Sequence, residues 1–226
     1  MNTEVIKLTL PVMCGYVPLG IAFGILFVEL GYPWYFSSLM GIIIFAGAAQ
    51  FMAIGLLAAG AGLFEVFIST LLLNARHVFY GLSLIKDFDV TGWRKWYLIF
   101  GLTDETYSLL TSLPRSMTNS GVMKLQITGY NQGYWIIGCT LGALFGKEID
   151  INTQGLDFTL SALFMVLTIE QFKASQKLAP FIIAFVVGLA ALILISASNM
   201  LLFSLVMVLC LLLGQYRLQT RILKAK

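Results

Sequence analysis

The chain has 226 residues, of which 59% are hydrophobic and only 11% are charged. Its mean hydropathy is +0.89. Soluble domains are roughly 45–50% apolar and about 25% charged, so this composition excludes an ordinary soluble protein and indicates a protein embedded in lipid. The net charge of +3, without a Lys/Arg cluster, excludes a nucleic-acid-binding surface.

Apolar runs between charged breaks predict an all-α transmembrane helical bundle that forms a single integral membrane domain over residues 1–226. In chain order the predicted spans are 8–29, 35–58, 64–85, 96–113, 128–146, 157–172, 179–196 and 200–216. The fourth and sixth are more polar than the others, so we expect seven or eight spans.

Lys and Arg residues in short loops predict the orientation of the bundle. With a cytoplasmic N-terminus and eight spans, the loop 114–126 and the basic tail after Tyr216 face the cytoplasm. The loop 86–95 then faces the outside, although it contains Arg94 and Lys95.

The first span contains a proline and glycines, in the order Gly15-Tyr16-Val17-Pro18-Leu19-Gly20. Proline and glycine weaken a helix, and transporters use broken helices to direct backbone dipoles at substrates, so Tyr16, Pro18 and Gly20 are candidate site residues. A plain kink is the alternative. Gly20 and Gly24 are echoed by Gly142 and Gly146, which indicates either an internal repeat or close helix packing.

Three further spans place polar groups at membrane depth, where ionisable side chains are functional candidates by default. Gln50 follows the small residues 46–49 in the second span, and Asn74, Arg76 and His77 lie in the third. The fourth contains adjacent acids, Asp104 and Glu105, which predicts an ion pair with Arg76 and one extra carboxyl group. A structural salt bridge that fixes helix register explains the same residues.

Asp157 at the start of the sixth span is a weaker candidate, since helix capping alone accounts for it. His77 is the only histidine, and the three cysteines are far apart in the sequence. The sequence therefore predicts neither a metal site nor a bound cofactor.

Taken in order, these stretches resemble the AzlC family, the large subunit of two-component branched-chain amino acid exporters. The likeness runs through 10–20 with Phe23-Gly24, then through 46–51, 74–77, 102–106, 155–158 and 162–164. It covers nearly the whole chain, although the last 40 residues match only in hydrophobicity.

The resemblance implies a bacterial inner-membrane protein that exports leucine, isoleucine and valine, and methionine or related analogues, in exchange for protons. It also implies a small AzlD-type membrane partner. A zwitterionic substrate needs a cationic or dipolar site, which Arg76 or the break at 15–20 would provide, and an acidic site at Asp104 or Glu105. Phe23, Phe45 or Phe51 would then contact the aliphatic side chain.

Three other functions are weighed against this interpretation. An intramembrane enzyme would need a nucleophile–base pair or metal ligands, for which the sequence offers little. The membrane subunit of an ATP-driven transporter would need a cytoplasmic coupling loop, and the predicted loops are short. A carrier of another amino acid or of a small organic acid is an alternative that the sequence does not exclude.

Overall fold

The computed structural model describes residues 3–85, 87–112, 120–146 and 178–195, with the short pieces 165, 168–169, 172–173, 203–204, 206–212 and 214. Every regular element in this part of the chain is an α-helix, as the sequence predicts. The chain divides into two compact units. Unit 1 comprises residues 1–55 and 73–160, and unit 2 comprises 56–72 and 161–226.

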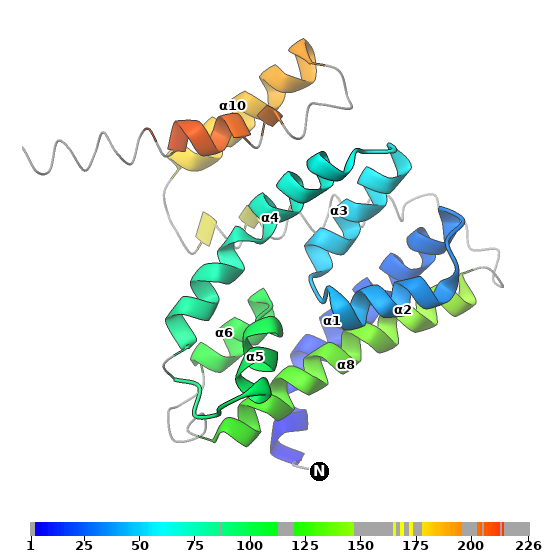
Figure 1. Ribbon diagram of the computed structural model, residues 1–226, viewed down its shortest axis with the longest axis vertical. Coiled ribbons are helices and arrows are strands. Elements are labelled where there is room, and N and C mark those ends of the chain that lie inside the picture. Colours follow the sequence, from blue (N-terminus) through cyan, green and yellow to red (C-terminus); the bar gives the residue numbers. More distant parts are fainter. Residues whose placement is uncertain are drawn as a thin grey trace, which may run out of the picture. The chain divides into compact units, whose positions relative to one another are not determined.

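A pair of parallel helices, α1 (Thr3–Glu29) and α8 (Gly121–Phe145), forms the centre of unit 1 (Figure 1). They pack so closely because glycines face one another across the contact. A Cβ atom added to Gly24 would overlap the backbone of Cys139, and one added to Gly142 would overlap the backbone of Ile21. Two explanations were open for the similar glycine pairs Gly20/Gly24 and Gly142/Gly146. The structure confirms close helix packing, since small residues let two backbones approach.

The interruption predicted in the first span is absent. Helix α1 continues through Pro11 and Pro18, and Gly20 lies against the backbone of Gly138. The neighbouring helix stabilises this stretch, so the proline does not break it.

The second predicted span, 35–58, is instead a helical hairpin of α2 (Trp34–Ile43) and α3 (Gly47–Ala58). Helix α2 runs antiparallel to α8, because Ser37 Oγ donates to the carbonyl of Cys139 and the carbonyl of Ile42 accepts from Gln132. At Phe45 the backbone adopts a positive φ of 41°, rare for a non-glycine residue. The chain then turns back, and Phe51 of α3 packs against Phe23.

The fourth predicted span, 96–113, is a second hairpin, built from α5 (Trp93–Phe100) and α6 (Asp104–Ser112). Tyr97 of α5 donates to Gln132 in the middle of α8. After the break at Gly101, α6 returns toward the start of α8, where Leu110 lies in one apolar cluster with Val5 and Met123.

The two hairpins enter from opposite ends of the α1–α8 pair. Hairpin α2–α3 follows α1, which runs away from the N-terminus, whereas hairpin α5–α6 follows α4 (Leu63–Leu84), whose end packs beside Val5 at the N-terminal end. Residues of the first hairpin match residues of the second at one constant sequence separation. Ile44-Phe45 corresponds to Ile99-Phe100, and Gln50 corresponds to Glu105. Within unit 1, residues 3–55 (α1, α2 and most of α3) and residues 73–112 (the second half of α4, α5 and α6) therefore form an inverted repeat of the kind found in many transporters.

The remaining predicted spans agree with the structure to different degrees. The third, 64–85, matches α4, and the seventh, 179–196, matches α10 (Ala179–Leu194) of unit 2. The fifth begins earlier than predicted, at Gly121, because the Ser120 side chain caps α8 by accepting from the amide of Met123. The sixth and eighth fall largely outside the described residues. Within the described part, Thr3–Glu29 alone is both long and apolar enough to pass as a membrane span on composition.

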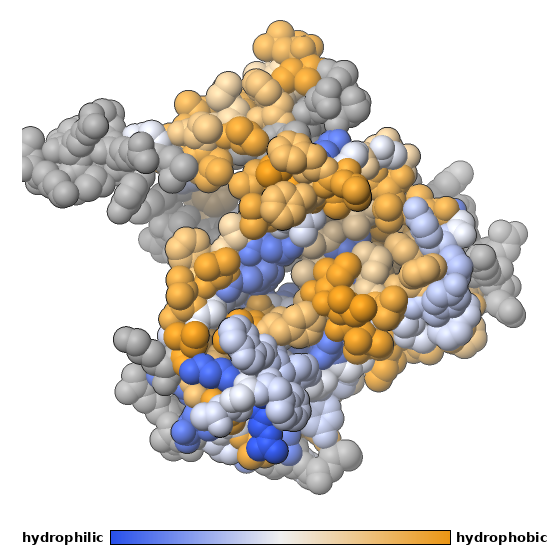
Figure 2. Space-filling view, in the orientation of Figure 1, coloured by the Kyte–Doolittle hydropathy of each residue, from blue (hydrophilic) through white to orange (hydrophobic). Residues whose placement is uncertain are grey.

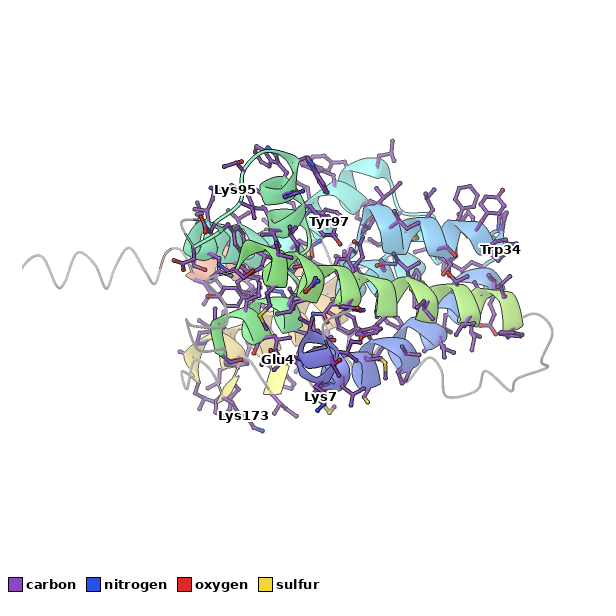
Figure 3. The ribbon with its side chains drawn as sticks, turned by 90° about the horizontal axis from the view of Figure 1, so that it is seen from below. Glu4, Lys7, Trp34, Lys95, Tyr97 and Lys173 are labelled. Atoms are coloured by element: carbon purple, nitrogen blue, oxygen red, sulfur yellow. The ribbon has the colours of Figure 1, made fainter. Side chains whose placement is uncertain are left out.

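The predicted placement of loops 86–95 and 114–126 on opposite sides of the membrane is wrong. The side chain of Lys124, which is 5% exposed, donates to the backbone carbonyl of Asp87. Val90 packs against Gly121, and Phe88 shares the apolar cluster with Val5. Because 96–113 is a hairpin and not a span, the chain returns to the end from which it came, and Lys95 lies at the opposite end of unit 1 from Trp34 (Figure 3).

Candidate functional site

The tips of the two hairpins meet halfway along α1 and α8. Phe45 and Phe100, the equivalent residues of the inverted repeat, have ring centroids 6.4 Å apart, and Tyr16 of α1 lies 6.4 Å from Phe45. In Figure 2, hydrophilic side chains appear among apolar ones beside the middle of α4. This junction gathers most of the polar residues that the sequence predicts for the site.

Arg76 and Asp104 form the ion pair that the sequence predicts. Arg76 Nη2 lies 2.6 Å from Asp104 Oδ2, and both side chains are about three-quarters buried, with exposures of 25% and 22%. Tyr80, one turn after Arg76 on α4, donates to Asp104 Oδ1 at 2.7 Å. The carboxylate of Asp104 is thus held at the start of α6 by two residues of α4, one of them cationic.

The neighbouring acid, Glu105, begins a chain of hydrogen bonds that leads into the protein interior. The Tyr16 hydroxyl lies 2.6 Å from both Glu105 Oε2 and Thr103 Oγ1. Thr103 donates to Thr106 at 3.0 Å, and the Asn131 side-chain amide also donates to Thr106 at 3.0 Å. An exposed carboxyl group is therefore linked through three buried hydroxyls to Asn131, which is completely buried.

Gln50 lies on the other hairpin and is also completely buried. The indole nitrogen of Trp135 donates to Gln50 Oε1 at 2.8 Å, which joins α3 to α8. The Nε2 atom of Gln50 and the Oδ1 atom of Asn131 have no hydrogen-bond partner among the described residues.

The other predicted site residues are placed less centrally. Pro18 and Gly20 belong to the helix contact of α1. Asn74 and His77 are half-buried on α4, and the His77 ring meets Tyr80 edge-on at 5.6 Å. Asp157 lies outside the described residues. Within the described ranges, no group of three or more His, Cys, Asp or Glu side chains is placed to hold a metal ion.

The structure adds residues that the sequence analysis did not select: Tyr80, Thr103, Thr106, Asn131 and Trp135. The sequence does contain a signal for Asn131, which is its position next to Gln132. Two adjacent amides inside the apolar stretch 128–146 are costly in a membrane. The two threonines are uncharged residues inside the predicted span 96–113, and their role follows only from the break between α5 and α6.

Several known proteins similar to this chain are named as membrane proteins. An uncharacterized membrane protein of Helicobacter pylori is 38% identical over 93% of this chain and 93% of its own length. The branched-chain amino acid transport protein AzlC of Bacillus subtilis is 38% identical over 75% of this chain and 67% of its own. The inner membrane protein YgaZ of Escherichia coli is 31% identical over 76% and 74%.

No solved structure matches the chain. One protein family, described as AzlC protein, matches residues 11–149, which include both hairpins and the junction between them. Together with the relatives, this match identifies a membrane transport protein: the chain belongs to the AzlC family.

Proposed function

We propose that the chain is the large subunit of a secondary transporter that exports branched-chain amino acids across the bacterial inner membrane. Leucine, isoleucine and valine, with methionine and related analogues, are the proposed substrates. A small AzlD-type membrane protein is the proposed partner, and protons moving inward are the proposed driving ions. The Bacillus relative is named a branched-chain amino acid transport protein, which supports the substrate class.

The observation that carries the proposal is the junction of two broken helical segments around paired charges. Transporters place substrate and ion sites where discontinuous helices meet at the interface of inverted repeats. Here the junction contains the Arg76–Asp104 ion pair. A charged pair at membrane depth is costly, which favours a role beyond fixing the helices together.

Within this junction we assign the transported proton to Glu105. Both carboxylate oxygens of Asp104 are already engaged, one by Arg76 and the other by Tyr80. Each hydroxyl carries one hydrogen. Because Thr103 donates its hydrogen to Thr106, the Tyr16 hydroxyl can donate to only one of its two neighbours, Thr103 or Glu105. If Tyr16 donates to Thr103, the short contact between Tyr16 and Glu105 needs a hydrogen from Glu105, which a protonated carboxyl group would provide.

Counterflow of radiolabelled leucine in membrane vesicles tests the proposal, with and without the small partner. We expect leucine counterflow that survives ATP depletion, and net leucine transport under an imposed pH gradient that is lost with a proton uncoupler. Asp104→Asn and Arg76→Gln should each reduce exchange at least about tenfold while the protein stays in the membrane, because each leaves a partly buried charge without its ionic partner.

Glu65→Gln is a matched control, since Glu65 lies on the same helix but belongs to unit 2. We expect this variant to exchange leucine at the wild-type rate. Normal exchange by either Asp104→Asn or Arg76→Gln would contradict the assignment of the site. Exchange that requires ATP would contradict the secondary-transport mechanism.

A further inference from the structure

The beginnings of α3 and α6 both face the junction, and their chemistry differs. Helix α6 starts with two acids, Asp104 and Glu105, and the Thr103 hydroxyl accepts from the backbone amide of Thr106. The positive end of the α6 dipole is therefore capped and neutralised by this chain's own residues.

The beginning of α3 has no such compensation. The residues before and within its first turn are Phe45, Ala46, Gly47, Ala48 and Ala49, and none has a side-chain acceptor. The amides that open a helix have no intrahelical acceptor, and together with the helix dipole they favour an anion. At this same turn stands Gln50, whose amide nitrogen is buried without a partner.

The orientation of the Gln50 amide is fixed by its neighbour. The Trp135 indole nitrogen is a donor only, so it must face the oxygen of Gln50, and the –NH2 group must point elsewhere. This amide is fully buried, and an unsatisfied buried donor costs about 1–3 kcal/mol. A bound acceptor beside α3 would remove that cost.

Asn131 supplies the opposite group. Its nitrogen donates to Thr106, and its Oδ1 is a buried acceptor without a partner. Asn131 precedes Trp135 by one turn on the same face of α8, about 6 Å along the helix axis. Asn131 and Trp135, which holds Gln50, are thus one helical turn apart on the same face of α8. This face offers an unpaired donor and an unpaired acceptor, the two kinds of group that a zwitterionic head group needs.

We propose that this junction binds the α-amino and α-carboxylate groups of the substrate. The carboxylate binds the first amides of α3 and the Gln50 –NH2 group, and the ammonium group binds Asn131 Oδ1. The aromatic rings of Phe45, Phe100 and Trp135 then surround the aliphatic side chain. This site rests on the proposed function and replaces the break at 15–20, which the structure does not contain, as the carboxylate site.

The test is binding of radiolabelled leucine to the purified full-length chain in nanodiscs, with two competitors that each lack one charged group. Leucinamide has no carboxylate, and 4-methylpentanoate has no ammonium group. Gln50→Met should weaken leucine at least tenfold and leucinamide less than about twofold. Asn131→Leu should weaken leucine and leucinamide at least tenfold and leave 4-methylpentanoate within about twofold.

Gln132→Met is the matched control. This amide is next to Asn131, and both of its polar atoms already have protein partners, Tyr97 and the carbonyl of Ile42. The control should lower thermal stability without changing the ratio of leucine to leucinamide affinity. This comparison separates the loss of a ligand contact from the loss of packing. The ratio of leucine to leucinamide affinity remains informative even for a variant with a lowered melting temperature.

Two results would overturn the inference. If wild-type protein binds leucine but Gln50→Met or Asn131→Leu leaves the competitor ratios unchanged, the site is wrong and the proposed function stands. If wild-type protein binds no α-amino acid, the proposed function fails and the site fails with it.

Discussion

At the residue scale, Tyr16 occupies the most informative position, because its hydroxyl lies 2.6 Å from both Glu105 and Thr103. Its ring is buried, so substitution by phenylalanine preserves packing and removes only the hydroxyl. If Glu105 carries the proton, the hydroxyl chain from Tyr16 to Thr106 connects that proton with the junction.

Tyr16→Phe should therefore separate transport from its driving force. We expect leucine counterflow, which needs no gradient, to fall less than about threefold, while uptake driven by an imposed pH gradient falls at least about tenfold. The lost hydrogen bond should lower stability by about 0.5–1.5 kcal/mol. Both transport assays use the same vesicles, so the difference between them cannot come from protein amount.

Tyr134→Phe provides the control for this change. The Tyr134 hydroxyl lies 3.2 Å from Thr9 Oγ1 and joins α8 to α1, as the Tyr16 hydroxyl joins α1 to the start of α6. Thr9 also donates to the carbonyl of Val5, so it keeps a partner when Tyr134 is changed. Equal effects of the two variants on the gradient-driven assay would argue against a special role for Tyr16.

The sequence alone indicated most of the charged residues of the site and could not supply their neighbours. Arg76, Asp104 and Glu105 are conspicuous because ionisable groups are rare in apolar segments. Thr103, Thr106 and Trp135 are common residue types, and they become notable only through contacts with residues distant in sequence, such as Trp135 with Gln50. Such contacts depend on where two hairpins end, which local patterns do not reveal.

At the element scale, the glycines of the α1–α8 contact are the main determinant of packing. Gly24→Ala and Gly142→Ala should each destabilise the protein by about 1–3 kcal/mol, because the new Cβ atoms overlap backbone atoms that cannot move away. Thermal melting followed by size-exclusion chromatography in detergent measures the effect.

The same two helices provide matched controls. A Cβ atom on Gly15 of α1 or on Gly133 of α8 meets nothing within 4 Å. Alanine at these positions should be neutral or slightly stabilising, since alanine favours a helix more than glycine does. Loss of stability equal to that of Gly142→Ala would show that helix propensity, and not close approach, explains the glycines.

Helix breaks were harder to predict than helices, and for a physical reason. Pro18 is a strong local signal, yet α1 continues through it, with Gly20 packed against α8. The actual breaks, at Phe45 and Gly101, carry weak signals within apolar sequence, and Phe45 adopts a φ of 41° without being a glycine. The contacts of the hairpin tips with Tyr16 and Thr128 stabilise these breaks.

At the scale of the whole molecule, the two hairpins alter the expected topology. Counting apolar runs treats 35–58 and 96–113 as membrane spans. Each span counted in error places all later loops on the wrong side of the membrane. With both as hairpins, Lys7, Arg94, Lys95 and Lys124 belong to the same end of unit 1. That distribution agrees better with the excess of basic residues on the cytoplasmic side of membrane proteins than the eight-span arrangement does.

Cysteine accessibility distinguishes the two arrangements directly. In a background without Cys14, Cys139 and Cys210, single cysteines replace Thr91 before α5, Val122 at the start of α8, or Trp34 at the start of α2. Because Thr91 and Val122 line one hollow, a membrane-impermeant maleimide should label both from the same side and Trp34→Cys from the other. The eight-span arrangement predicts labelling of Thr91→Cys and Val122→Cys from opposite sides, and that result would refute the hairpins. If positive charge marks the cytoplasmic side, Thr91→Cys is labelled in inside-out vesicles and Trp34→Cys in intact cells.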